Sequence, residues 1–357
     1  MKTKRSEQTV KRVPRIFYVA VLNVLACFSV VALHCSNMAF WNYRPGRAWL
    51  FGNLVETLFY FAVPIFFMLS GVTLLEYRER YSTRVYLKKR FVKTVIPFLA
   101  WSVIAYIYWV LVQNQGRWLQ NPLEVLDGIL NTRFVTIYWF FLPLFAVYLA
   151  IPVLARVEDK LQTFRYAIIL GLIFVAALPL LCELIGLQYN PALTPPPVLG
   201  YVIYVLLGYN LSKVTLSKRQ RQMIYLCGVL GWALHFFGTW WLSVRAGEVV
   251  MTWKGYTNLP AVMQAIAVFV FFKHLDYDKW LKKLHKLKLE AVINWLSSVT
   301  FGIYLVHIYF VLHVPSWLGF SEDNWVWLAA GAVAVFAVCA GIVWLLQKIP
   351  GVRRIIP

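Results

Sequence analysis

The sequence predicts an all-α membrane protein that crosses the bilayer about ten times and keeps both termini in the cytoplasm. Hydrophobic residues make up 61% of the 357-residue chain and charged residues only 14%, whereas a soluble domain carries about 25% charged residues. The apolar residues occur in runs of about twenty, which is the length that spans a bilayer as a helix. The basic residues gather in alternate connecting segments. Together these observations exclude a soluble globular protein.

The apolar runs do not alternate with polar residues, so they predict helices rather than the strands of a membrane barrel. The first run follows the basic segment MKTKRSEQTVKRVPR and lacks an A-x-A cleavage site, which predicts a retained span rather than a signal peptide. The sixth and eighth runs are the shortest. The predicted spans are residues 16–35, 50–75, 94–113, 134–155, 166–187, 197–212, 223–243, 259–273, 296–314 and 325–347.

The formal charge of +20 is explained by membrane topology. With the N-terminus inside, 29 of the 35 Lys and Arg residues lie in the tails and the inner connections, and only 6 lie in the outer ones. Such a bias is typical of cytoplasmic segments. The charge therefore does not indicate nucleic-acid binding, and we predict a multi-pass membrane protein.

No connection between spans is long enough for a separate soluble domain, so the chemistry is assigned to a membrane domain at residues 16–347. Residues 1–15 and 348–357 are predicted cytoplasmic tails. Residues 273–295 are basic and amphipathic, which predicts an inner-surface segment resting on anionic lipid. Its apolar side chains are Trp280, Leu281, Leu284 and Leu287. The five cysteines show no CxxC spacing and predict neither disulfides nor a metal site.

The strongest functional signal is His34, an ionisable side chain at the end of the first span. At ~1.5 Å per residue it lies roughly 27 Å along that span, near the outer boundary. Glu56 lies a turn or two into the second, antiparallel span, at a similar depth. Ionisable groups at membrane depth mark functional sites, so we predict that this imidazole and carboxylate face one another. The alternatives are an interfacial histidine and a solvated carboxylate at the rim.

Four further residues are candidates for the wall of a cavity. Asn23 precedes His34 by about three turns and shares its helix face, although an amide there also suits helix packing. Ser70 lies beside a glycine that permits close approach of a neighbour or a ligand. Trp139, at an outer span end, suits an interfacial belt or a sugar face. His307 lies in the middle of its span, where a structural hydrogen bond is the simpler interpretation.

A basic cluster, YRERYSTRVYLKKRFVKTVIP at residues 77–97, precedes the third span. Topology alone explains much of this charge. Arginine and lysine side chains at a helix start also suit phosphate groups, so Arg84, Lys89, Arg90 and Lys93 are predicted to bind an anion. The chain has no Walker-type glycine loop, which argues against nucleoside triphosphate hydrolysis.

Six segments together resemble the integral-membrane acyltransferase family 3, particularly its surface-polysaccharide O-acyltransferase branch. The resemblance extends over nearly the whole chain and depends on the order of the motifs. The segments are LNVLACFSVVALHC (22–35), ETLFYFAVPIFFMLSG (56–71), YLKKRFVKTVIPF (86–98), YWFFLPLFAVYLAIPVL (138–154), GYVIYVLLGYNLS (200–212) and VTFGIYLVHIYFV (299–311).

The resemblance implies an enzyme that takes an acyl group, usually acetyl, from acyl-coenzyme A on the cytoplasmic side and places it on a carbohydrate hydroxyl at or beyond the outer face. His34 matches the family's catalytic histidine. Arg90 and Lys93 match basic positions associated with the acyl donor. Asn23 is a departure, because many members have arginine there. The expected partners are therefore acetyl-CoA as donor, a surface polysaccharide or lipid-linked oligosaccharide as acceptor, and membrane lipids. The expected location is a cell membrane, namely the bacterial plasma membrane.

The expected mechanism uses His34 as a general base, or as a transient acyl carrier, with Glu56 holding its tautomer. The donor phosphates are expected on the inner basic cluster. The rival function is a transporter or flippase for a lipid-linked sugar or a small anion, since a polar cavity between spans would serve either. The absence of an evident inverted repeat argues against transport.

Overall fold

The computed structural model describes residues 16–198, 200–277, 279, 288–321 and 323–357. This part of the chain is helical with no strands, so the predicted all-α membrane fold is confirmed. The N-terminal tail at 1–15 and the four apolar side chains predicted to rest on lipid (Trp280, Leu281, Leu284 and Leu287) lie outside the described residues.

The helices follow one another with short connections. π-helical turns join α4 to α5 and α8 to α9, and a 3-10 turn, Thr136–Phe140, leads into α7. The α-helices are α1 (Phe17–Trp41), α2 (Arg47–Phe59), α3 (Ala62–Leu74), α4 (Thr83–Arg90), α5 (Ile96–Tyr108), α6 (Pro122–Leu130), α7 (Phe141–Leu154), α8 (Lys160–Gly171), α9 (Leu178–Leu184), α10 (Val202–Lys213), α11 (Lys218–Ala246), α12 (Leu259–Lys273), α14 (Leu289–Trp317) and α15 (Trp325–Leu346).

Every predicted span coincides with a helical segment. In the described chain, 8 of these segments are long and apolar enough to cross a membrane. The other two are α10, with 12 residues, and α12, with 15 residues, which correspond to the two shortest apolar runs. The number of crossings and the side of each terminus stay predictions from hydropathy and charge.

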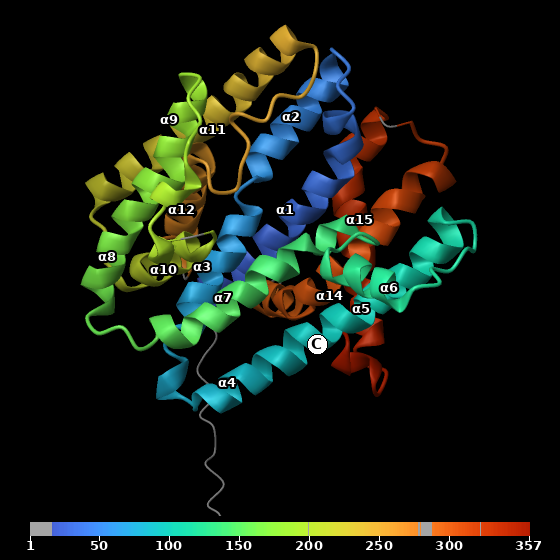
Figure 1. The fold of residues 1–357 in the computed structure, drawn as a ribbon, viewed down its shortest axis with the longest axis horizontal. Coiled ribbons are helices and arrows are strands. Elements are labelled where there is room, and N and C mark those ends of the chain that lie inside the picture. Colours follow the sequence, from blue (N-terminus) through green and yellow to red (C-terminus); the bar gives the residue numbers. More distant parts are fainter. Residues whose placement is uncertain (1–15, 199, 278, 280–287, 322) are drawn as a thin grey trace, which may run out of the picture.

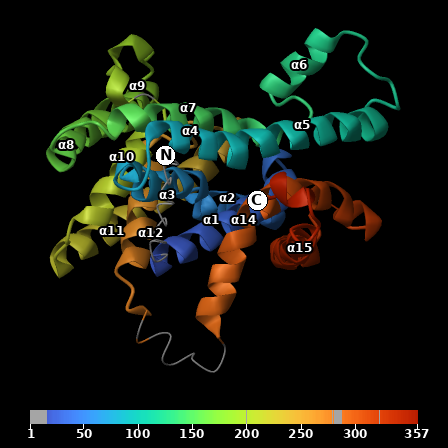
Figure 2. The same cartoon turned by 90° about the horizontal axis from the view of Figure 1, so that it is seen from below.

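Helix α1 lies in the middle of the bundle, with α2, α3, α14 and α15 packed around it (Figure 1). It runs to Trp41 rather than ending at residue 35, because α1 contains no glycine or proline and the next ones along the chain are Pro45 and Gly46. Figure 2 shows α4 and α5 as one rod along one side of the bundle, with α6 projecting beyond it. The central position of α1 places His34 among several helices rather than at a lipid-facing surface.

The second predicted span is broken into α2 and α3 at Tyr60 and Phe61. Pro64 has no backbone N–H and cannot donate to the carbonyl four residues earlier, which predicts such a break. The amide nitrogen of Gln264 on α12 donates to the carbonyls of Thr57 and Leu58, just before the break, at 3.0 and 2.9 Å. A broken helix is tolerated at membrane depth when neighbouring side chains satisfy its backbone in this way.

Helices α3 and α10 approach so closely that their backbones touch. A Cβ added at Gly71 would meet the carbonyl oxygen of Val205 at 2.0 Å, and one added at Gly208 would meet that of Met68 at 2.1 Å. The Ser70 hydroxyl donates within its own helix to Phe66 O at 3.0 Å. The glycine next to Ser70 therefore serves helix packing, and Ser70 lies outside the cavity described below, contrary to its predicted place in a cavity wall.

The substitution Gly71→Ala is expected to destabilise the protein by roughly 1–3 kcal/mol, because the added methyl group must push α3 away from α10. Thermal unfolding in detergent measures this as a lower Tm. The matched control is Gly341→Ala on α15, where an added Cβ meets nothing within 4 Å. An equal Tm for the two variants would contradict the close packing of α3 and α10.

The predicted C-terminal tail packs against the bundle. Ile356 is 1% exposed and belongs to the same apolar cluster as Ile303 on α14 and Val343 on α15. The indole nitrogen of Trp101 on α5 donates to Ile355 O at 3.1 Å. The last residues thus tie α5 to the α14–α15 pair.

Candidate active site

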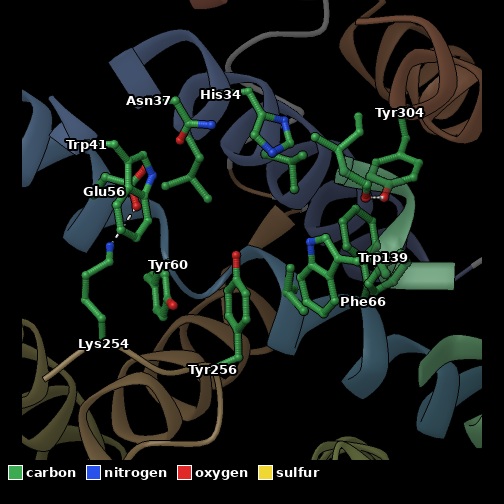
Figure 3. Close-up of a pocket in the computed structure, with 15 residues that line it drawn as sticks. His34, Asn37, Trp41, Glu56, Tyr60, Phe66, Trp139, Lys254, Tyr256 and Tyr304 are labelled. Atoms are coloured by element: carbon green, nitrogen blue, oxygen red, sulfur yellow. Dashed lines mark hydrogen bonds and ion pairs between the residues drawn. The ribbon is translucent and has the colours of Figure 1, made fainter. Parts of the chain in front are cut away.

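A cavity of about 190 Å³ opens at the His34 end of α1. Its walls come from α1, α2, α3, α14, the turn before α7 and the segment 247–258 that joins α11 to α12. Figure 3 shows polar and aromatic side chains converging on this space. The lining residues are Val30, Leu33, His34, Asn37, Trp41, Glu56, Tyr60, Val63, Phe66, Ile137, Trp139, Phe140, Lys254, Tyr256 and Tyr304.

The imidazole of His34 contacts that of His307, the second histidine among the predicted site residues. Nδ1 of His34 lies 2.7 Å from Nε2 of His307 on α14, and the ring planes are 13° from parallel with centroids 5.0 Å apart. The His307 ring is fully buried, whereas His34 is partly exposed to the cavity. The structure therefore joins two predicted candidates that lie 273 residues apart in the sequence.

The surrounding hydrogen bonds assign the tautomer of both rings. Nδ1 of His307 faces the carbonyl oxygens of Ile303 and Tyr304 at 3.0 and 2.9 Å. Carbonyl oxygens only accept, so this nitrogen carries a proton. In the neutral ring, Nε2 of His307 is then an acceptor, and the proton between the rings belongs to Nδ1 of His34. Nε2 of His34 is left unprotonated, with its lone pair available to the cavity.

Neighbouring helices hold the backbone around this pair. The indole nitrogen of Trp327 on α15 donates to Cys35 O, directly after His34, at 3.0 Å. The Tyr304 hydroxyl donates to Ile137 O in the turn before α7. A base held by such contacts keeps its lone pair directed at one place, which is what proton transfer requires.

Glu56 shares the cavity with His34, as its predicted depth implies, but its partner is different. Its Oε2 accepts a hydrogen bond from Nζ of Lys254 at 2.7 Å, and the two side chains are 5% and 1% exposed. The expected contact, in which Glu56 holds the His34 tautomer, is therefore replaced by the His34–His307 contact. The difference arises because the chain between α11 and α12 folds back over the cavity and brings a lysine to the carboxylate.

Aromatic rings form the side of the cavity across from His34 (Figure 3). The rings of Tyr60 and Tyr256 stack with centroids 4.3 Å apart. The ring of Trp139 stacks on Tyr256 as well, with centroids 5.5 Å apart. Burial, with smaller contributions from Tyr60, Glu56 and Tyr201, raises the pKa of Tyr256 well above its ordinary value. Its hydroxyl thus stays protonated and can donate. Trp139 is among the residues that line the cavity.

Asn23 lies deeper on α1 and packs helices together. Its amide nitrogen donates to Ser297 O and Oγ at 3.1 Å and to Thr300 Oγ1 at 2.8 Å, all on α14. This matches the packing alternative for Asn23, and the residue is not among those lining the cavity. The same contacts hold α1 and α14 in the register that brings the two histidines together.

The predicted anion-binding residues lie on α4 and the turn after it, away from the cavity. Lys89 lies over the ring of Tyr81 at 3.8 Å, and Arg90 lies over Tyr148 at 5.5 Å. Arg84 and Lys93 are exposed. The cluster thus has two cations held against aromatic rings and two free to meet solvent, an arrangement that can bind phosphate groups.

Sequence reasoning missed several residues of the cavity wall, namely Asn37, Trp41, Tyr60, Lys254 and Tyr256. Lys254 was visible only as one of the few basic residues in an outer connection. Its burial could not be predicted because it depends on how that connection folds. In the described residues, no group of three or more His, Cys, Asp or Glu side chains could hold a metal ion.

A family model described as an acyltransferase domain matches residues 16–344. No curated protein and no solved structure matches the chain. The matched region runs from the residue before α1 into the last turn of α15, so it contains both histidines, the Glu56–Lys254 pair and the basic cluster on α4.

Proposed function

The chain belongs to the acyltransferase family whose model spans residues 16–344, and from this premise we propose that it is a membrane O-acyltransferase. The acyl group is acetyl, the donor is cytoplasmic acetyl-CoA, and the acceptor is a hydroxyl of a cell-surface or lipid-linked polysaccharide. The observation that carries the proposal is the His34–His307 pair, which offers an unprotonated ring nitrogen to a cavity.

The proposed reaction starts at the acceptor hydroxyl. Nε2 of His34 takes the hydroxyl proton while the oxygen attacks the thioester carbonyl carbon. The carbon–sulfur bond then breaks, and the coenzyme A thiolate takes the proton back from His34. A C–O bond replaces the C–S bond, and no proton is gained or lost overall. The same nitrogen could carry the acyl group briefly, which would divide the transfer into two steps.

His307 stabilises the charged form of His34 in this scheme. When Nε2 of His34 is protonated, its Nδ1–H still donates to Nε2 of His307. The two carbonyl oxygens facing the far side of His307 increase the electron density on its ring. Charge-assisted hydrogen bonds of this kind are shorter and stronger than neutral ones. His307 is therefore assigned as a positioning residue for the base.

The size of the cavity limits what enters it. A cavity of about 190 Å³ has room for the acylated thiol end of the donor beside a sugar hydroxyl. The nucleotide of coenzyme A stays outside it. We assign the nucleotide phosphates to Arg84, Lys89, Arg90 and Lys93 on the basis of their charge. Paired charges at Glu56 and Lys254 leave the cavity without net charge, in keeping with a neutral thioester and a hydroxyl.

The double variant Lys89→Ala/Arg90→Ala is expected to raise KM for acetyl-CoA about tenfold or more, because two charge-assisted contacts to phosphate are lost. Steady-state kinetics in detergent measure this, and kcat at saturating donor should change little. The control is Lys160→Ala/Arg165→Ala on α8, which removes equal charge elsewhere. An equal KM in both double variants would contradict the assigned donor site.

Two experiments test the function itself. The purified protein in detergent should release coenzyme A thiol from acetyl-CoA when surface polysaccharide stripped of its esters by mild alkali is added. A transporter would release none, since detergent abolishes compartments. Mass analysis of the polysaccharide from cells without this protein should show the loss of acetyl groups. Unchanged acetylation together with absent thiol release would contradict the proposal.

A further inference from the structure

Lys254 is the most deeply buried cation described in the chain, and it comes from a connection rather than from a helix. Its side chain is 1% exposed, and its ammonium lies over the rings of Phe40 at 4.4 Å and Tyr60 at 4.5 Å. The ion pair with Glu56 and the aromatic rings surround the charge. A lysine in such a cage has little freedom to meet a substrate, so its role is to hold other groups in place.

Glu56 links Lys254 to α1, the helix that carries His34. The side-chain amide of Asn37 forms hydrogen bonds when its nitrogen, rather than its oxygen, faces Glu56 and Leu33. That nitrogen then donates to Oε1 of Glu56 and to Leu33 O, both at 3.1 Å. Asn37 follows His34 by one turn of α1, and Leu33 precedes it. Both oxygens of Glu56 are thus engaged, one toward α1 and the other toward the segment 247–258.

The segment held by Lys254 carries Tyr256 into the cavity wall. Tyr256 stacks on Tyr60 and meets Trp139 on its other side. The hydroxyl of Tyr204 donates to Tyr256 O, and Asn258 donates to Thr252 O at 3.1 Å. This segment therefore has its own internal order, and the ion pair is its polar attachment to α2. Figure 3 shows the Glu56–Lys254 ion pair at one side of the cavity and Tyr256 between Tyr60 and Trp139.

We propose that Lys254 is a positioning residue for the acceptor. By binding Glu56 it fastens the segment 247–258 so that Tyr256 and Trp139 form the wall that orients a sugar ring opposite Nε2 of His34. The two charges neutralise one another, so the wall offers aromatic surface and a phenol hydroxyl, which suits an uncharged sugar unit. The proposal rests on the acyltransferase function and names the residue that sets acceptor binding.

The test compares single and paired substitutions. Lys254→Met leaves a buried carboxylate without its cation and is expected to lower Tm, whereas Lys254→Met/Glu56→Gln removes both charges and keeps an oxygen for Asn37, so Tm should recover. Acceptor KM should not recover. It should stay raised about tenfold or more in the double variant, measured with the alkali-treated polysaccharide, while kcat and KM for acetyl-CoA change little.

A second readout does not depend on activity. Amide hydrogen exchange in residues 247–258 should be faster in the double variant than in the wild type, because the attachment to α2 is lost. The matched control removes the ion pair between Lys213 and Glu76 at the other end of the bundle. Lys213→Met/Glu76→Gln should leave acceptor KM and exchange in 247–258 unchanged. Lys254→Arg, which keeps the charge, should retain most of the acceptor affinity.

The outcomes separate the two claims. Wild-type acceptor KM and unchanged exchange in the Lys254→Met/Glu56→Gln variant would overturn the positioning role while the acyltransferase function stands. A wild-type protein that transfers no acyl group would overturn the proposed function, and exchange would still show whether Lys254 fastens the segment. A parallel rise in the KM values of both substrates would indicate general damage and would also contradict a role specific to the acceptor.

Discussion

Replacing His34 with glutamine is expected to lower kcat for acyl transfer about 10²-fold or more, the loss typical of removing a general base. Glutamine keeps polar atoms in the cavity wall but has no nitrogen that can take the hydroxyl proton. KM for acetyl-CoA should change little, because we assign the phosphates of the donor to the basic residues of α4 and the turn after it. Rates of thiol release and of acetyl transfer to the alkali-treated polysaccharide measure the effect.

His313→Gln is the matched control for that experiment. His313 lies on the same helix as His307, and its Nε2 contacts the hydroxyl of Tyr108 at 2.9 Å, outside the cavity. It should retain wild-type kcat. Near wild-type activity in the His34 variant would show that the chemistry occurs elsewhere in the chain.

Replacing His307 with leucine is the second large expected effect. Leucine fills similar volume but cannot accept the proton of His34 Nδ1, so the ring loses the contact that fixes its tautomer. We expect kcat to fall about 10²-fold, since a displacement of a catalytic group by about 1 Å can cost that much. Acceptor KM should stay near the wild-type value, because His307 does not line the cavity.

His307→Gln distinguishes positioning from mere packing. The glutamine carbonyl oxygen can reach toward the place of Nε2 and accept from His34, so this variant should retain more activity than His307→Leu. Equal Tm values with unequal kcat values would support a positioning role. Full activity in His307→Leu would show that His34 needs no partner on α14.

The sequence was sufficient for the helices because lipid imposes a simple rule. Long apolar runs such as those of α1 and α15 must satisfy their backbone internally, and only helices do so within one segment. The missing N–H of Pro64 also explains the break between α2 and α3, which divides a span predicted as one. The end of α1 was misplaced because hydropathy marks where lipid stops rather than where a helix stops, and Trp41 lies beyond that boundary.

The site was predictable only in part, for reasons of distance along the chain. Depth calculated from helix rise put His34 and Glu56 at a similar level, and both residues line one cavity. It could not show that His307, which is 273 residues away, would take the position expected for the carboxylate. Lys254 belongs to a connection without periodicity, so no pattern predicted its burial. Asn23 was ambiguous until its contacts with Ser297 and Thr300 were known.

The most direct test of the account concerns the proton on His34. Histidine ring ¹⁵N resonances of the purified protein at neutral pH, with His34→Gln used to assign the signal, report which nitrogen is protonated. We expect a protonated Nδ1 and an unprotonated Nε2 for His34, and loss of that preference in His307→Leu. A proton resident on Nε2 in the wild type would leave no base facing the cavity and would contradict the account.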